Sequence, residues 1–163
     1  MRTAISPWAE RYGTALAGLA VLLGCALLAP TFTEPQNLLN VGKDAAYLAV
    51  LSVGFALALL VAELDLSVAD VASLAAVCTG FLVQGGYPPL LCAGAGLLVG
   101  LGAGALNGAA VTRLGVPSLI ATLGTAAIAR GLSFGLTGGV AFVGRWPRGF
   151  TGLSVEPVPL TLQ

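Results

Sequence analysis

The sequence predicts an all-α fold, a polytopic transmembrane helical bundle with about five membrane segments. The first reason is composition: 57% of the 163 residues are hydrophobic and only 9% are charged, against about 25% charged in an ordinary soluble domain. The second is spacing. Apolar stretches of about the 20 residues that a helix needs to cross a bilayer alternate with short segments rich in Pro, Gly or acidic residues. We therefore expect a multi-pass membrane protein.

The first two predicted spans lie in the N-terminal part of the chain. One runs from about Tyr12 to Ala29 and ends before Pro30. A cleaved secretory signal is the alternative, but the residues after Cys25 stay apolar where a mature lipoprotein would become polar. Residues 32–44 are predicted to form an amphipathic or irregular connector, and residues 45–62 the second span.

The chain must turn or break near Glu63–Ser67. One straight helix over residues 45–83 would be about 58 Å long at about 1.5 Å per residue, nearly twice the hydrocarbon thickness of about 30 Å. The third predicted span, Ala69–Val83, is short and ends at the turn Gly85–Pro89. Its shortness is compatible with a broken helix whose polar elbow lies below the membrane surface, where protein or water must surround it.

Polar residues at this break are the main candidates for function. Glu63, Asp65 and Asp70 are three of seven acidic residues, and a charge beside apolar spans costs several kcal/mol unless it meets water, a counter-ion or helix-end amides. Ser67 and Asp70 have the spacing of a helix cap, which is a structural role. Glu63, Asp65 and Ser67 are candidates for the substrate pathway or for coupling. Asp65 is also a candidate partner of Arg130.

The fourth predicted span, Leu90–Thr112, carries glycine at every fourth position. The four glycines that share one helix face are Gly96, Gly100, Gly104 and Gly108. A face without side chains lets a neighbouring helix approach closely, which is how helices associate in lipid. We predict a tight helix contact along this face, with a permeation groove as the alternative. Asn107 is predicted to find a hydrogen-bond partner, in helix packing or in substrate contact.

The fifth predicted span runs from Ser118 to about Leu136, with Pro117 at its start. Arg130 lies more than three turns into this span, so it either reaches the far interface or forms a functional ion pair. We expect a transmembrane region over residues 1–139 and an irregular, truncated extramembrane loop over residues 140–163. The basic residues are split evenly between the two sides, so the positive-inside rule leaves the orientation open.

The sequence lacks the common motifs of enzymes. It has no histidine, no phosphate-binding loop and no G-x-S-x-G motif, so we expect no catalytic residue and no metal site. The net charge is zero and the basic residues do not cluster, so nucleic-acid binding is not expected. A membrane protein without enzymatic activity is the prediction.

Several short motifs follow one another along the chain. They are Asn37-Leu-Leu-Asn40, Glu63-Leu-Asp-Leu-Ser67, Leu106-Asn-Gly108, Val111-Thr-Arg-Leu-Gly-Val-Pro117, Ala121-Thr-Leu-Gly-Thr125, Ala127-Ile-Ala-Arg-Gly131 and Leu136-Thr-Gly-Gly139. This ordered set resembles the N-terminal half of bacterial ABC-importer permeases of the ribose, xylose, rhamnose and autoinducer-2 type. The family usually has Gly-Gly-Ile-Asp-Leu-Ser-Val-Gly at the second motif, where this chain has Ala62-Glu-Leu-Asp-Leu-Ser-Val-Ala69. Ala62 and Glu63 depart from that pattern.

The resemblance implies half of a ten-helix permease, which forms the substrate pathway of an ATP-driven sugar importer in the bacterial inner membrane. It also implies the partners: a second permease half or subunit, an ABC ATPase subunit and a periplasmic sugar-binding protein. ATP would be used by the partner subunit, and this chain would bind no cofactor. Because permeases of this family are about twice as long, we expect a fragment, a truncated reading frame or one half of a split permease.

Two other functions stay open at this stage. A small membrane scaffold or assembly protein would accept the length of the chain. A small dimeric secondary carrier would use Glu63, Asp65 or Arg130 as coupling charges. The ordered motifs favour the importer, because a scaffold has no need of them, and none of these features identifies the sugar.

Overall fold

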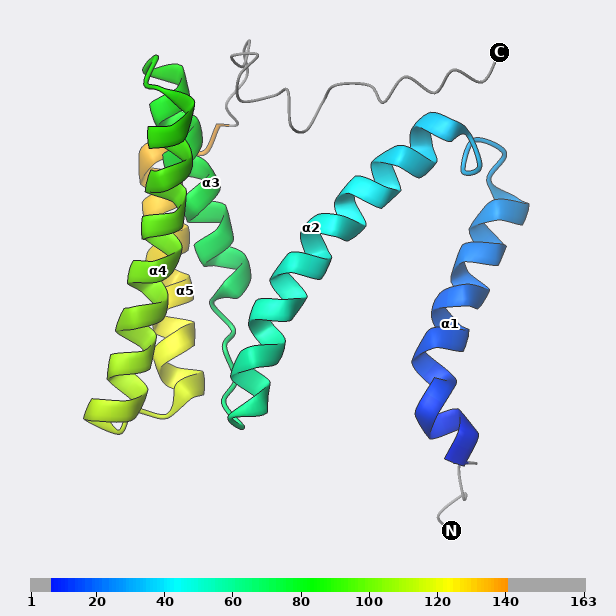
Figure 1. Cartoon of the computed structure of the whole chain (residues 1–163), viewed down its shortest axis with the longest axis horizontal. Coiled ribbons are helices and arrows are strands. Elements are labelled where there is room, and N and C mark those ends of the chain that lie inside the picture. Colours follow the sequence, from blue (N-terminus) through cyan, green and yellow to red (C-terminus); the bar gives the residue numbers. More distant parts are fainter. Residues whose placement is uncertain (1–6, 141–163) are drawn as a thin grey trace. The chain divides into compact units, whose positions relative to one another are not determined.

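The computed structural model describes residues 7–140, in which the chain is helical apart from short connections (Figure 1). The helices are α1 Pro7–Leu28, α2 Pro35–Leu60, α3 Val68–Gln84, α4 Pro89–Leu114 and α5 Ser118–Thr137. The predicted all-α class is confirmed, and each predicted span corresponds to one helix. Residues 141–163 of the predicted extramembrane loop lie outside the described residues. The chain divides into two compact units, residues 1–50 and residues 51–163, which we describe separately.

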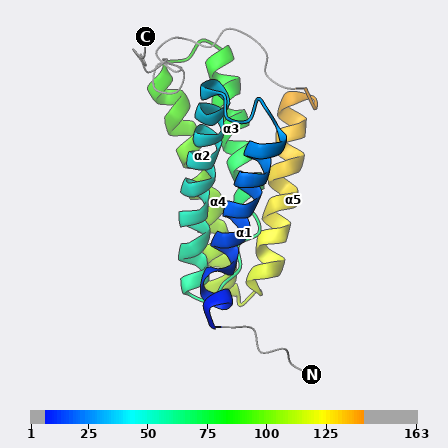
Figure 2. The same cartoon turned by 90° about the vertical axis from the view of Figure 1, so that its right-hand side faces the viewer.

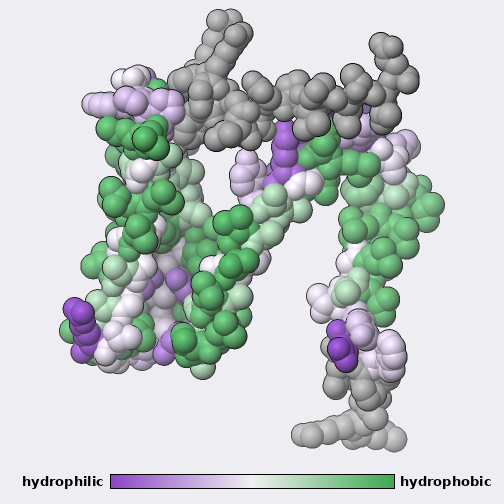
Figure 3. All heavy atoms as spheres, in the orientation of Figure 1, coloured by the Kyte–Doolittle hydropathy of each residue, from purple (hydrophilic) through white to green (hydrophobic). Residues whose placement is uncertain are grey.

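The lengths and surfaces of the helices suit a bilayer. Four of them, α1, α2, α4 and α5, are long and apolar enough to cross a membrane. Helix α3 has 17 residues, about 26 Å at about 1.5 Å per residue, which falls short of a hydrocarbon core of about 30 Å. Large apolar side chains lie exposed along the helices, as Figure 3 shows in green. These faces match lipid, which confirms the prediction of a multi-pass membrane protein.

In the first unit, α2 begins earlier than we predict from the sequence. The connector predicted over residues 32–44 is wrong beyond Glu34, because α2 is helical from Pro35 onward. A proline at the first position of a helix loses no hydrogen bond, and its fixed φ suits the start of a helix. Asn37 ties the first turn to the preceding segment, since its Nδ2 donates to the carbonyl oxygen of Phe32 at 2.8 Å.

The second unit has its core among α3, α4 and α5. Helix α3 packs against both α4 and α5, and α4 packs against α5; Figures 1 and 2 show these helices side by side. The buried residues at these contacts are small: Gly80, Cys92, Ala126 and Ala129 are among them. Small side chains let helices approach closely, so this core is held by dispersion contacts and by hydrogen bonds between helices.

Candidate functional site

The break between α2 and α3, residues 61–67, is here called the elbow. Its backbone is anchored to the first turns of α5 by hydroxyl groups. Leu64 N–H donates to Ser118 Oγ at 3.3 Å, and Leu66 N–H donates to Thr122 Oγ1 at 3.2 Å. The Thr122 hydroxyl also donates to the carbonyl oxygen of Leu64 at 3.4 Å. Non-helical backbone between apolar spans needs such partners wherever lipid surrounds it, because lipid supplies none.

The predicted break at Glu63–Ser67 is thus confirmed. Helix α3 begins beside the second turn of α5, and not beside Ser118, the first residue of α5. Ser118 and Thr122 are one turn apart on α5, so the elbow runs along about one helical turn, about 5.4 Å. Helix α3 is short because the non-helical elbow takes the place of a further helical turn at its start.

Helix α2 ends in a left-handed residue that is not glycine. Ala62 has φ +59°, and it is the one non-glycine residue with positive φ in the described part of the chain. Its N–H donates to the carbonyl oxygen of Leu59 at 2.9 Å, and the N–H of Glu63 donates to that of Ala58 at 3.1 Å. This is the Schellman arrangement, whose left-handed position is usually glycine because a Cβ is strained there. The position where the chain departs from the family motif therefore carries backbone strain.

A chain of hydrogen bonds joins the elbow to α4 and α5. Thr125 Oγ1 donates to Asn107 Oδ1 at 2.5 Å, and Asn107 Nδ2 donates to Ser67 Oγ at 3.0 Å. Ser67 Oγ donates in turn to Asp65 Oδ1 at 2.6 Å. Ser67 and Asn107 are buried, with 2% and 7% of their surface exposed. A buried polar network whose members are all paired fixes the relative positions of the elements that carry them.

The cap that we predict for Ser67 and Asp70 is wrong. Ser67 occupies the N-cap position of α3, but its side chain makes no capping hydrogen bond. Its φ of −84° and ψ of −13° are helical, whereas a capping residue needs extended dihedral angles to direct its oxygen at the next N–H groups. Asp65 caps instead: its Oδ1 accepts from Ser67 N–H at 2.8 Å, two residues on, as in an Asx turn.

Asp70 forms an ion pair with Arg130, so the predicted pairing of Asp65 with Arg130 is also wrong. Arg130 Nε donates to Asp70 Oδ1 and Nη2 to Asp70 Oδ2, each at 3.0 Å. Two parallel hydrogen bonds give this pair a defined geometry. The pair joins the first turn of α3 to the middle of α5, which explains why an arginine lies so deep in a membrane span. Of the two alternatives for Arg130, the ion pair is present.

The glycine face of α4 is in tight contact only at one end. A Cβ placed on Gly96 would lie 2.6 Å from Thr79 Oγ1 and 3.4 Å from the carbonyl oxygen of Ala75. Within the described residues, a Cβ on Gly100, Gly104 or Gly108 would meet nothing within 4 Å. The predicted contact along all four glycines is therefore wrong for these three positions, because the facing residues of α3 do not reach them.

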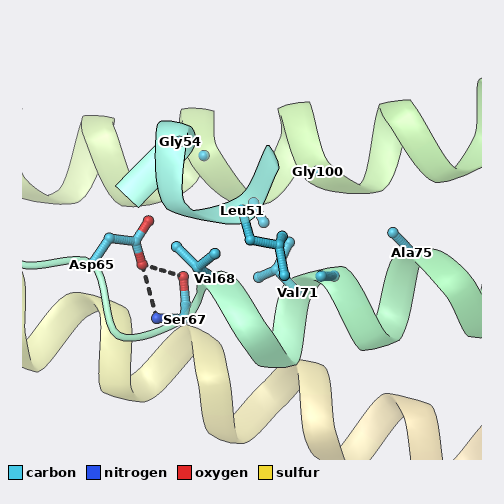
Figure 4. A pocket seen from close by; sticks show the side chains of 11 residues that line it. Leu51, Gly54, Asp65, Ser67, Val68, Val71, Ala75 and Gly100 are labelled. Atoms are coloured by element: carbon cyan, nitrogen blue, oxygen red, sulfur yellow. Dashed lines mark hydrogen bonds between the residues drawn. The ribbon is translucent and has the colours of Figure 1, made fainter. Parts of the chain in front are cut away.

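Beside the open part of this face lies a cavity of about 290 Å³ (Figure 4). The elbow, α3, α4 and the second half of α2 line it. Asp65 and Ser67 give it polar groups, and Val71, Ala72, Gly100 and Gly104 are among its apolar lining residues. The structure thus brings Asp65, Ser67 and Asn107 together in one network. It leaves Glu63 outside, with no side-chain hydrogen bond to the described residues, and places Arg130 in a separate ion pair.

Three hydroxyl residues of this site are not among the site residues predicted from the sequence. Ser118, Thr122 and Thr125 recur at intervals of four and three residues, which places them on one face of α5. That face is the one that holds the elbow and Asn107. A polar stripe at helical spacing in an apolar span was the signal that could have identified them. Within residues 7–140, no three His, Cys, Asp or Glu side chains gather as metal ligands.

Comparison with known proteins gives a consistent result. The family model of the permease component of the branched-chain amino acid transport system matches residues 37–156. The autoinducer 2 import system permease protein LsrC of Yersinia enterocolitica is 39% identical over 133 residues, which are 80% of this chain and 36% of that protein. LsrC proteins of Yersinia pseudotuberculosis and Yersinia pestis are each 38% identical over 133 residues, 80% of this chain and 37% of theirs. No solved structure matches significantly.

The chain spans little more than a third of the length of these relatives. The matched segment nevertheless includes α3, α4, α5, the elbow and almost all of α2. These are the elements that form the polar network and the cavity, and the predicted resemblance is confirmed. The chain belongs to the permease components of the branched-chain amino acid transport system family, as a multi-pass protein of the bacterial inner membrane.

Proposed function

We propose that this chain forms part of the substrate pathway of an ATP-driven importer of a sugar or a similar small solute. The observation that carries this proposal is the elbow: a polar, hydrogen-bonded, non-helical segment between two apolar helices, with a cavity beside it. Non-helical segments of this kind are found within membranes where they are buried in protein or line a water-filled path. Its presence in a member of a permease family makes the substrate path the natural assignment.

The partners follow from the same proposal. A cytoplasmic ABC ATPase supplies the energy, a periplasmic sugar-binding protein delivers the substrate, and a further permease region completes the pathway. The chain spans little more than a third of its relatives, so we propose that transport requires the permease region that those proteins carry beyond the matched segment. Nucleotide and loaded binding protein would each shift the pathway between two conformations through their different affinities for them.

Uptake of radiolabelled sugars tests this proposal. Cells or liposomes receive this chain, its ATPase and its binding protein, with or without the remaining permease region, and D-ribose, D-xylose and L-rhamnose are offered in turn. We expect ATP-dependent accumulation of at least one sugar in the complete set only. Accumulation in the set without the remaining region would contradict the required completion, and no accumulation in the complete set would contradict import of these three sugars.

The same assay tests the Asp70–Arg130 ion pair. If the pair holds α3 on α5 in one conformation of the pathway, Asp70→Asn and Arg130→Gln should each lower uptake more than they lower the amount of protein in the membrane. Exchange of the two charges, Asp70→Arg with Arg130→Asp, should restore part of the uptake. Arg113→Gln is the matched control, because Arg113 lies exposed in the last turn of α4. Full uptake by both single variants would limit the pair to a structural role.

A further inference from the structure

We propose that the cavity beside the elbow is a hydrated binding subsite for an uncharged, hydroxyl-bearing small molecule, with Asp65 as its hydrogen-bond acceptor. This inference deepens the proposed function and rests on it, because it assigns one stage of the substrate path to named residues. Its experiment measures the cavity directly, without transport.

The first step is that Asp65 presents a free oxygen. Oδ1 accepts both hydrogen bonds from Ser67, one from its N–H and one from its hydroxyl. Oδ2 has no hydrogen bond to any residue that the structure describes. In Figure 4 the second carboxylate oxygen points away from Ser67. The carboxylate is thus held rigidly by one oxygen and leaves the other for a ligand, and Asp65 is one of the residues that line the cavity.

The second step is that this cavity must contain water when it is not occupied by a ligand. A carboxylate between apolar spans is stable only beside water, a counter-ion or donors. Arg130 is already engaged by Asp70, and no basic side chain lines the cavity among the described residues. An apolar helix docked over Gly100 and Gly104 would bury the free oxygen of Asp65 without a donor, which is costly. Hydration therefore fits the lining better than a close helix contact.

The third step is the class of ligand. At about 290 Å³, the cavity lies at the lower end of the roughly 300–1,000 Å³ of small-molecule pockets. Its one charged lining residue is negative, so it disfavours anions. One free carboxylate oxygen is far fewer than the roughly six oxygen ligands of a hard metal cation, and the nearby start of α3 contributes positive partial charge. A hydroxyl group, which needs only one acceptor, is the ligand that this arrangement fits, and the apolar walls suit its carbon skeleton.

Protection of an introduced thiol tests the inference. The full chain, with Cys25, Cys78 and Cys92 replaced by Ala, is reconstituted in lipid nanodiscs with Ala72→Cys in the cavity wall or Leu101→Cys on the exposed face of α4. Labelling by a charged thiosulfonate requires a hydrated thiolate. We expect labelling of Ala72→Cys to be at least about tenfold faster, because Leu101 faces lipid. Equal rates would overturn the hydrated cavity.

The ligand class is tested by what slows this labelling. Xylitol at about 100 mM should slow it about threefold if its dissociation constant is about 50 mM, since the protection factor is one plus the ratio of concentration to dissociation constant. Gluconate, a polyol with a carboxylate, and methylammonium, a small cation, should not protect. Protection by methylammonium alone would replace the assignment by a cation site, and protection by neither polyol nor cation would overturn it.

Two substitutions tie the protection to the named groups. Asp65→Asn keeps Oδ1 and its two hydrogen bonds but replaces the free charged acceptor by an amide N–H group, so xylitol protection should fall from about threefold to close to one, the level of no ligand. Gly104→Leu fills the cavity from α4, and it should slow labelling of Ala72→Cys. Full protection in the Asp65 variant would overturn its role.

The two proposals can fail separately. Protection of the Ala72→Cys thiol by xylitol without sugar uptake would support the cavity site and contradict the importer, whereas sugar uptake without protection would place the substrate path elsewhere.

Discussion

Gly96 and Gly104 lie on the same face of α4, about two turns apart, and their surroundings differ. At Gly96 the face is filled: the Thr79 hydroxyl of α3 is so close that even a Cβ would have to displace it, and the carbonyl oxygen of Ala75 lies in contact beside it. At Gly104 the face is open, and a cavity takes the place of the neighbouring helix. The same residue type at the same spacing therefore serves a close helix contact at one end and a space at the other.

The connections at the two ends of α3 explain the difference. Near Gly96, α3 and α4 are joined by a short turn over residues 85–88, and the hydroxyl of Thr79 donates to the carbonyl oxygen of Cys92 at 3.3 Å. At the other end, α3 begins only after the elbow, and the link to α4 is the hydrogen bond between Asn107 and Ser67. A polar bridge replaces close packing there and leaves room beside it for the cavity.

The largest expected effect comes from leucine at the filled end. Gly96→Leu should destabilise the protein by about 3 kcal/mol, because the side chain must displace Thr79 and the α3 backbone. Gly104→Leu is the matched variant: it gains the same helix propensity, and its side chain enters the cavity, so we expect a smaller loss of about 1 kcal/mol, from partial burial of the free oxygen of Asp65. Reversible unfolding in mixed detergent micelles measures both.

Equal losses in the two variants would break this comparison and show that the open end is closed in solution. Leu97→Ile is the control for a substitution on the lipid-facing surface of α4, since Leu97 is 69% exposed. It should leave the free energy of unfolding nearly unchanged. A loss of association with the completing permease region in Gly104→Leu alone would show instead that a further helix docks at the open end.

The order of spans, the break at Glu63–Ser67 and the all-α class could be predicted because they depend on local signals: apolar runs, Pro and Gly positions, and a helix too long for the membrane. What could not be predicted is which side of a helix meets a neighbour. Gly96 and Gly104 look alike in sequence, and only the placement of α3 separates them. The same holds for Arg130, whose partner proved to be Asp70 and not Asp65, because the relative position of α3 and α5 decides the pairing.

Asn107→Ala tests the hydrogen-bond network at the end of α3 that lies near Gly104. We expect a change in stability between those of Gly96→Leu and Ala62→Gly in size. The change removes the acceptor of the Thr125 hydroxyl and a donor to Ser67, so we expect a loss of about 2 kcal/mol, within the range for buried hydrogen bonds. Thr112→Val is the control, because within residues 7–140 the Thr112 hydroxyl bonds only to the carbonyl oxygen of Gly108 on its own helix. A loss no larger than in this control would mean that packing, and not the network, holds this end of α3.

The smallest expected change in stability concerns the start of the elbow, where Ala62 has a left-handed conformation with φ +59°. The corresponding end of α4 has Gly115 at φ +67°, which pays no steric penalty. Ala62→Gly should therefore stabilise the protein by about 1 kcal/mol, since a Cβ costs about that much in the left-handed region. Gly115→Ala should destabilise it by a similar amount, and the two variants together should nearly cancel. Unfolding of both in the same micelles measures this, and a loss of stability in Ala62→Gly would show that α2 does not end in the Schellman arrangement.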